Sequence, residues 1–299
     1  MKIVSIALNV PGPVAVARLV ADGAQAIKVE PPWGDPLDAL CKRWYDDLHR
    51  NVAVERIDLK TAEGRARMMS LLRDADVFFA SHRPSALARL GLDARSLQAA
   101  LPSLRHVNIV GDTANPEEPG HDLTYQARAG LLPALTLRQA QGHPEQRRGV
   151  SGTEGSRALP LTLFGDMAGA ERAHAALKDV MHRPGASREI GLYDALVDLA
   201  APLRYGLTSA GGHLGGGNPA YGIYAAREGA IAVTALEPHF RARLYEGLGL
   251  GDGDDPSALF STKTALEWEE WAAVRDLPLV AIRERSFASE DKHDASSGV

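Results

Sequence analysis

The sequence predicts an α/β fold in which helices cover both faces of a mostly parallel β-sheet. Two observations support this prediction. Short apolar runs alternate with amphipathic helical patterns along the chain, and the first of them form a strand–helix–strand unit. In addition, 299 residues with 45% hydrophobic and 24% charged side chains are enough for one large or two ordinary globular domains.

The opening unit is the clearest of these patterns. Residues 2–8 form an apolar run typical of a buried strand, and residues 26–30 form a second. Between them, residues 11–24 predict a helix, with proline at its start and Gly23 near its end. The alternation continues with a helix at 61–75, a strand at 76–80, short helices at 85–91 and 94–101, and a strand at 105–111.

The second half of the chain predicts a change of domain. Residues 164–182 predict a helix, and residues 188–206 predict a strand start followed by another helix. A glycine-rich stretch then precedes a hairpin at 221–235, helices at 237–249 and 262–276, and a strand at 277–284. We therefore predict a large domain over residues 1–205 and a smaller α+β domain over 206–299. The polar stretches 138–157 and 286–299 predict a loop and a frayed tail.

Composition and charge exclude several functional classes. A net charge of −5 and a pI near 6.1 leave no basic footprint for nucleic acid, so we expect a small-molecule partner. The single cysteine, Cys41, excludes a disulfide framework and a multi-cysteine metal site. Residues 1–13 lack the pattern of a signal peptide or a membrane span, so we expect a cytoplasmic protein. No G-x-G-x-x-G follows the first strand, which disfavours a nicotinamide or flavin dehydrogenase.

Ionisable residues stand at two predicted helix starts. His121 and Asp122 follow a Pro-Gly turn in the stretch EPGHDLTYQARAG, and Asp166 begins the helical stretch DMAGAERAHAAL. The ordinary role of an aspartate at such a place is to cap the helix by accepting a backbone N–H. A histidine beside it is then a polar loop residue. The residues alone leave structural and functional roles open.

Several stretches, taken in order, resemble the class III CoA-transferases of the CaiB/BaiF type, a family that also contains α-methylacyl-CoA racemase. The resemblance covers roughly residues 6–284 and is closest to the racemase-like members. The stretches that carry it are PGPVAVARLVADGAQAIKVEPP, IDLKTAEGRARMMSLLRDADVFFASHRPSALARLGL, PGHDLTYQARAGLL, LTLFGDMAGA, GGGNPAYGIYAAREGAIAVTALEPHF and DLPLVAIRE.

The resemblance implies a Rossmann-like large domain that binds coenzyme A, a smaller domain, and a homodimer in which two ring-like chains interlock. Coenzyme A is then bound as the thioester of the substrate, and no metal ion is expected. Typical members continue beyond the position of Val299 and return to complete the large domain, so that return is expected to be missing here.

The resemblance also assigns roles to individual residues. In transferase members the acid that matches Asp166 attacks the thioester and forms a mixed anhydride. In racemase-like members it works opposite the histidine of a Gly-His-Asp motif, here His121, which leaves Asp122 as the local cap and support of His121. A glutamate that matches Glu237 lies near this pair, although a helix start before Pro238 explains that residue equally well.

Other residues are candidates for binding the substrate. Gly215, Gly216 and Gly217 match a run that transferases fold over the acyl intermediate, although an interdomain turn fits them as well. Arg83 and Lys28 are expected to meet phosphates of coenzyme A, although each also fits a solvated surface.

The residue types suit proton transfer at the carbon next to a thioester carbonyl. Inversion there needs a base on one face and an acid on the other, and imidazole with a carboxylic acid supplies both. A backbone N–H at the start of the helix near Asp166 is expected to stabilise the enolate oxygen. We therefore predict an acyl-CoA enzyme that epimerises the α-carbon. CoA transfer between carboxylic acids through an anhydride of Asp166 is the close alternative, and a non-catalytic CoA-binding subunit is a third.

Overall fold

The computed structural model describes residues 1–132 and 159–283, and the chain divides into two compact units, Met1–Ala200 and Ala201–Val299. The predicted domain boundary lies a few residues beyond this division and stays a prediction. The predicted loop at 138–157 and the predicted tail at 286–299 lie outside the described residues.

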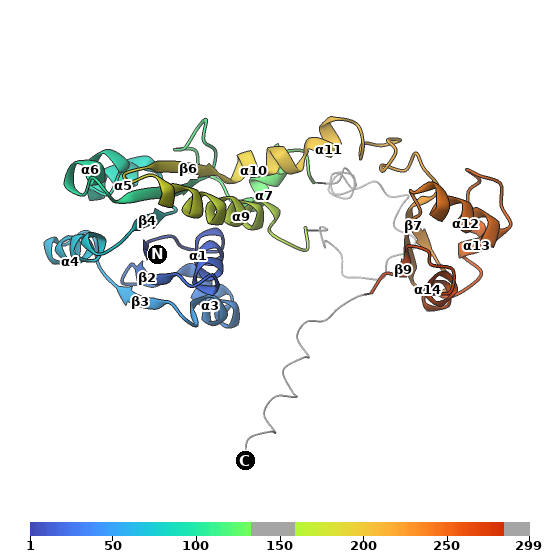
Figure 1. Ribbon diagram of the computed structural model, residues 1–299, viewed down its shortest axis with the longest axis horizontal. Coiled ribbons are helices and arrows are strands. Elements are labelled where there is room, and N and C mark those ends of the chain that lie inside the picture. Colours follow the sequence, from blue (N-terminus) through green and yellow to red (C-terminus); the bar gives the residue numbers. More distant parts are fainter. Residues whose placement is uncertain (133–158, 284–299) are drawn as a thin grey trace, which may run out of the picture. The chain divides into compact units, whose positions relative to one another are not determined.

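The first unit is built on a six-stranded sheet in which every pair of neighbouring strands is parallel (Figure 1). The strand order is β3-β2-β1-β4-β5-β6. The strands are β1 Lys2–Ser5, β2 Gln25–Glu30, β3 Ala53–Arg56, β4 Val77–Ala80, β5 Arg105–Val110 and β6 Ser187–Gly191. The predicted α/β fold is confirmed. Because the order reverses between β1 and β4, a crevice for ligands is expected at the carboxyl ends of these two strands.

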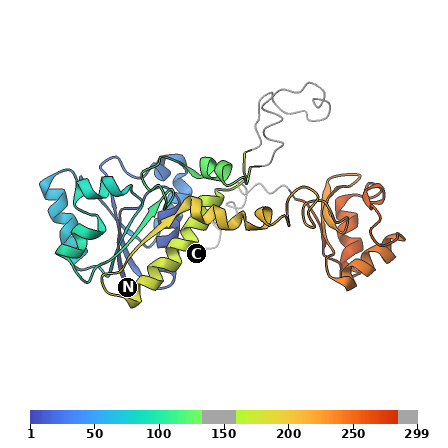
Figure 2. The same ribbon diagram turned by 90° about the horizontal axis from the view of Figure 1, so that it is seen from above.

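Helices cover both faces of this sheet (Figure 2). Neighbouring residues of a strand point to opposite faces, so Ile3 and Phe79 belong to one buried cluster while Val4 and Phe78 belong to another. The first cluster includes residues of α1 Pro11–Ala21, α7 Asp122–Arg128, α9 Phe164–Asp179 and α10 Leu192–Leu199. The second includes residues of α4 Ala62–Arg73, α5 Pro84–Leu90 and α6 Ala94–Ala100. A 3₁₀ turn, Val180–His182, follows α9.

Three elements of this unit were not predicted. The strand β3 lies at the edge of the sheet and none of its residues is buried, so its sequence AVER lacks the apolar run of a central strand. The short helices α2 Pro36–Leu40 and α3 Lys42–His49 bury few side chains and show no apolar stripe. Cys41, between these two helices, is an exposed free thiol.

The second unit contains the predicted hairpin and helices. Its sheet is antiparallel, with β8 Ala230–Thr234 between β7 Tyr221–Ala225 and β9 Leu279–Ala281. One side of the sheet forms a buried cluster with apolar side chains of the helices, among them Leu244 and Trp268. The helices of this unit are α11 Ala201–Arg204, α12 Pro238–Leu248, α13 Ser257–Phe260 and α14 Ala265–Ala273.

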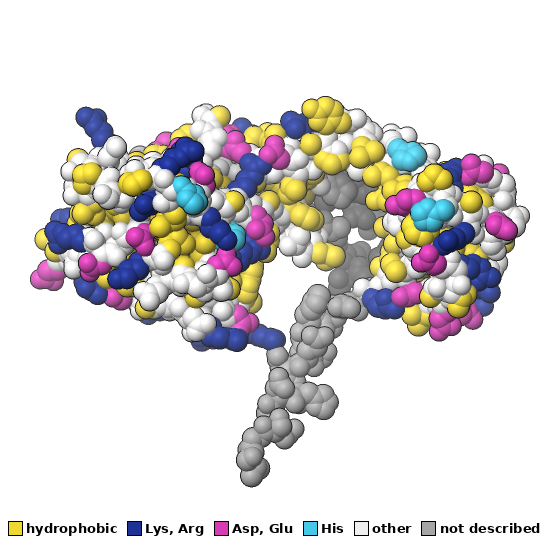
Figure 3. Space-filling model, in the orientation of Figure 1, with side chains coloured by type: hydrophobic (Ala, Val, Ile, Leu, Met, Phe, Trp, Pro, Cys, Tyr) yellow, Lys and Arg dark blue, Asp and Glu magenta, His cyan; other side chains and the backbone are white. Residues whose placement is uncertain are grey.

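Surface charges of both signs are intermixed on the face that Figure 3 shows. This pattern agrees with the absence of a basic footprint in the sequence. Within residues 1–132 and 159–283, no helix is long and apolar enough to cross a membrane. The same residues contain no cluster of three or more His, Cys, Asp or Glu side chains able to hold a metal ion.

Candidate active site

Asp166 lies in the first turn of α9, and its side chain is partly buried. The helix begins at Phe164, so Asp166 is its third residue and not its N-cap. The residue at the N-cap, Leu163, has no side-chain oxygen and forms no capping hydrogen bond. The first N–H groups of α9 therefore need an acceptor from elsewhere.

That acceptor is Asp122, which reaches across from α7. One oxygen of its buried carboxylate accepts the N–H of Gly165 at 2.6 Å and the N–H of Asp166 at 3.1 Å. The expectation that Asp122 is a local cap for its neighbour His121 was wrong, because Asp122 caps the other helix. The sequence could not show this contact, since Asp122 and Gly165 are 43 positions apart in the chain and meet only in the fold.

Gly165 lies at the close contact between α7 and α9. A Cβ atom at this position would stand 2.9 Å from Oδ1 of Asp122 and 2.9 Å from Cδ1 of Leu196. The absence of a side chain lets the carboxylate approach the backbone closely.

Asp166 has a strongly shifted acidity. Burial, with a further contribution from the negative charge of Asp122, raises the pKa of Asp166 to about 7. Both its protonated and its ionised forms are therefore populated near neutral pH. A carboxyl group of this kind can give or take a proton under ordinary conditions, which is a property of catalytic acids and bases.

His121 occupies the N-cap of α7 and is exposed. Its backbone is fixed by Thr124, whose Oγ1 accepts the N–H of His121 at 3.0 Å and lies 2.7 Å from its carbonyl oxygen. Because Asp122 follows it directly and binds α9, His121 stands at the helix end that is linked to Asp166. That the two side chains face one cleft stays a prediction.

The predicted N–H donor for an enolate oxygen is not free at Gly165 or Asp166. Both N–H groups donate to Asp122, and the next N–H, of Met167, donates to the carbonyl of Leu163. None of these three N–H groups is therefore free to donate to the predicted enolate oxygen.

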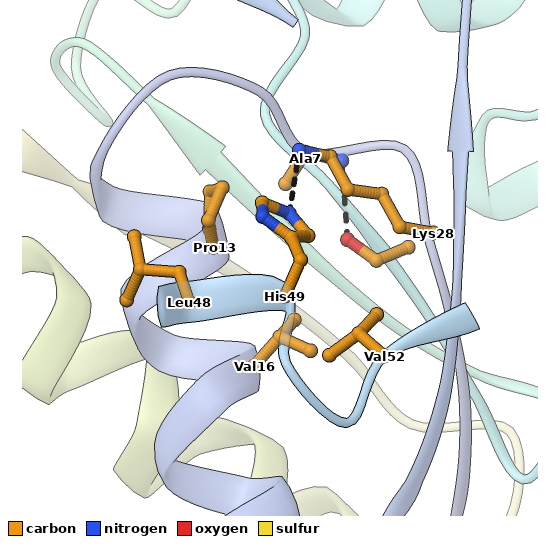
Figure 4. A pocket seen from close by; sticks show the side chains of 8 residues that line it. Ala7, Pro13, Val16, Lys28, Leu48, His49 and Val52 are labelled. Atoms are coloured by element: carbon orange, nitrogen blue, oxygen red, sulfur yellow. Dashed lines mark hydrogen bonds between the residues drawn. The ribbon is translucent and has the colours of Figure 1, made fainter. Parts of the chain in front are cut away.

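The two predicted phosphate ligands differ in availability. Arg83 is exposed at the N-cap of α5, shortly after the end of β4 at Ala80, and its side chain forms no hydrogen bond or ion pair with any described residue, although its charge contributes to the lowered pKa of Glu117. Lys28 is buried, and its ammonium contacts the carboxylates of Asp35 and Glu30. It also lies 2.9 Å from Nε2 of His49, as Figure 4 shows. Arg83 thus presents an open cation, whereas the charge of Lys28 is balanced within the protein.

The remaining candidates lie in the second unit. Glu237 is exposed at the N-cap of α12 and forms no side-chain capping bond. The run Gly215–Gly217 is folded on its own backbone: a Cβ at Gly215 would stand 1.8 Å from the carbonyl oxygen of Ser209, and Gly216 has a φ of +96°. These local requirements agree with a tight turn. The roles predicted for these four residues stay predictions.

The comparisons with known proteins assign the family. The model of CoA-transferase family III matches residues 1–277. The chain belongs to this family. The resemblance identified from the sequence is confirmed.

The matched relatives in this family include both transferases and racemases. The chain is 26% identical over 216 residues to the probable fatty acyl-CoA transferase Rv3272 of Mycobacterium tuberculosis, covering 67% of this chain and 51% of that protein. It is 31% identical over 149 residues to the succinate–glutarate CoA-transferase of Agrobacterium fabrum, covering 44% and 37%. To human alpha-methylacyl-CoA racemase it is 27% identical over 301 residues, covering 90% and 73%. The matched region thus spans about half, or less, of the two transferases.

Solved structures agree with the fold. The crystal structure of Rv3272 matches with a TM-score of 0.75 and 22% identity, covering 95% of this chain and 84% of that chain. A CAIB/BAIF family protein from Brucella suis matches with a TM-score of 0.71 and 20% identity, covering 95% and 83%.

One buried polar residue next to the candidate site was not predicted from the sequence. Gln126, one helical turn after Asp122, is buried and donates to the second oxygen of that carboxylate at 2.5 Å. An aspartate and a glutamine four residues apart on a helix are a known hydrogen-bonding pair, so the spacing carried a signal.

Proposed function

We propose that this chain is an acyl-CoA enzyme that moves a proton at the carbon next to a CoA thioester carbonyl. In this proposal Asp166 and His121 are the acid and the base, working from opposite faces of that carbon. The observation that carries it is the partly buried position of Asp166 beside Asp122, with the pKa of Asp166 raised to about 7. Inversion needs a group that holds a proton at neutral pH, and an ordinary exposed aspartate does not.

The reaction follows from these groups in two steps. The base on one face removes the α-proton, and the electron pair moves toward the thioester carbonyl to give an enolate. The acid on the other face then gives its proton to the same carbon, which inverts the configuration. Each group ends in the form in which the other began, so the return reaction uses the same pair with reversed roles. Glu237 is kept as a candidate catalytic residue by the family resemblance.

CoA transfer is the second candidate, and the names of the matched relatives favour it. Two of them, Rv3272 and the Agrobacterium fabrum protein, are named as transferases. In that reaction the ionised carboxylate of Asp166 attacks the thioester, and CoA leaves as the thiolate while an acyl anhydride forms. Asp166 alone is needed, without His121.

Substrate binding and assembly complete the proposal. Arg83 is proposed to contact a phosphate of coenzyme A, because its guanidinium is exposed and open at the carboxyl end of β4. Lys28 is a second candidate for the phosphate contact, and the run Gly215–Gly217 is proposed to fold over the acyl intermediate. We propose a homodimer by family resemblance alone.

Incubation with a panel of 2-methylacyl-CoAs in deuterated water tests the proposal. We expect deuterium at the α-carbon together with loss of optical purity, measured by mass spectrometry and chiral chromatography. A parallel incubation with acyl-CoA and free acids measures CoA exchange. CoA exchange without deuterium uptake would show that the protein is a CoA-transferase and not an epimerase. CoA binding without either reaction would indicate a non-catalytic subunit.

A further inference from the structure

The carboxylate that caps α9 is held on both of its oxygens. Oδ1 of Asp122 accepts the N–H groups of Gly165 and Asp166, and Oδ2 accepts the side-chain amide of Gln126 at 2.5 Å. Gln126 is 1% exposed, so its amide has no access to water and its position is fixed by this bond. Asp122 therefore has three N–H donors and is closed off from solvent.

This arrangement fixes the carboxylate of Asp122 beside Asp166. Asp166 has no comparable set of donors among the described residues. Ionisation of Asp166 is therefore opposed by burial and, in addition, by the negative charge of Asp122.

The other charged groups near the pair are engaged elsewhere. Tyr125 of α7 is affected by the charge of Asp166, which contributes to the raised pKa of that phenol. His121 lies exposed at the start of the same helix. Several charged groups on α7, α9, α10 and α1 are paired with groups other than Asp166. These pairs include Arg128 with Asp112 and Glu118, Arg172 with Asp198, His174 and Lys178 with Asp22, Asp179 with Arg188, Asp194 with Thr113, and Arg18 with Glu171. Asp122 is the charged group that acts on Asp166.

We propose that Gln126 is a positioning residue: its amide holds the carboxylate of Asp122 against the first turn of α9, where the charge of that carboxylate acts on Asp166. A role of Gln126 in catalysis rests on the proposed function, in which Asp166 is the acid that acts on the thioester substrate. The coupling between Gln126 and Asp166 does not rest on it. A merely structural glutamine would affect stability and leave the titration of Asp166 unchanged.

Titration of Asp166 in the full-length protein tests the coupling directly. The chain is labelled with ¹³C at aspartate carboxyl carbons, and the signal of Asp166 is assigned by its loss in Asp166→Asn. In Gln126→Met, which keeps the length of the side chain without a donor, we expect the midpoint of Asp166 to move toward acid by about one pH unit.

Two further variants keep the test valid if a buried substitution disturbs folding. Gly165→Ala approaches the same carboxylate from α9, where the added Cβ would stand 2.9 Å from Oδ1 of Asp122 and displace it. Alanine is favoured in a helix, so the fold is retained and the same shift toward acid is expected. Gln98→Met, on the exposed face of α6, is the matched control and should leave the midpoint in place. An unchanged midpoint of Asp166 in folded Gln126→Met and Gly165→Ala would overturn the proposal.

Activity separates this inference from the proposed function. If the protein epimerises an acyl-CoA, the pH dependence of deuterium uptake should shift with the titration midpoint in each variant. Shifts of the midpoint in a protein that turns over no acyl-CoA would support the coupling and reject the proposed function. Turnover of an acyl-CoA with an unshifted midpoint of Asp166 would support the proposed function and reject the coupling.

Discussion

The carboxylate of Asp122 accepts the backbone N–H of Asp166 at 3.1 Å, which brings two acids to one helix end. This contact stabilises α9 and at the same time makes ionisation of Asp166 unfavourable. A partly buried acid beside a second acid is suited to proton transfer, but its ionisation lowers the stability of the folded protein. This loss of stability can be measured.

Replacing Asp166 by asparagine should stabilise the protein at neutral and alkaline pH. The pKa of Asp166 is raised from 3.8 in the unfolded chain to about 7 in the fold, so the folded state binds more protons between these values. Its stability therefore falls as pH rises from about 4 to about 7. We expect Asp166→Asn to remove this loss, giving about 2–4 kcal/mol at pH 8 and no difference at pH 4. Urea unfolding at both pH values measures it, and equal stability at pH 8 would contradict the pKa shift.

The central strands could be predicted from the sequence because they are continuous apolar runs. Phe78 and Phe79 are both fully buried on opposite faces of the sheet, and such a run has few other interpretations. The edge strand β3 could not be predicted, since its exposed residues carry no such pattern. At the candidate site, Asp166 could be identified by resemblance. The cap from Asp122 could not, because it depends on a contact between helices far apart in the chain.

His106 should make the protein sensitive to acid. Its ring is 6% exposed, stacks on Phe78 with ring centroids 5.3 Å apart, and has no hydrogen-bond partner among the described residues. Burial lowers the pKa of His106 to about 4, whereas the unfolded chain takes up this proton near pH 6.5. Stability is thus complete above pH 6.5 and falls by about 3 kcal/mol toward pH 4.

The matching variant is His106→Phe, which keeps an aromatic ring and cannot be protonated. Any packing penalty of the larger ring is independent of pH, so the slope of stability against pH isolates the titration. We expect a shallower loss between pH 6.5 and 4 than in the wild type, measured by urea unfolding. Parallel curves for the two proteins would show that His106 does not titrate in this way.

Arg83 should contribute to coenzyme A binding through its charge. Loss of a charge-assisted hydrogen bond to phosphate corresponds to a weakening of about 10-fold or more in Kd. We expect this for Arg83→Ala, together with a weaker dependence of binding on salt, measured by calorimetry with coenzyme A. Arg95→Ala removes the same charge from the exposed side of α6 and serves as the control. Equal Kd values for the two variants would remove Arg83 from the site.

The protein should sediment as a homodimer. This expectation comes from the family resemblance. Analytical ultracentrifugation at micromolar concentration measures the mass directly, and a species of one 32.0 kDa chain would contradict it.

Single substitutions at His121 and Asp166 should separate the two candidate reactions. If the residues form an acid–base pair, His121→Ala and Asp166→Asn should each lower racemisation by ~10²-fold or more, because inversion needs a group on either face. Exchange of the α-proton with solvent deuterium can survive one substitution, since the remaining group still works from its own face. If Asp166 is instead a nucleophile, Asp166→Asn should abolish CoA transfer, because an amide lacks the attacking carboxylate oxygen, while His121→Ala should leave transfer largely intact. Deuterium uptake and CoA exchange are therefore measured on the same preparation of His121→Ala. Full transfer by that variant, with no proton exchange in the wild type, would reject the acid–base pair and assign the chemistry to Asp166 alone.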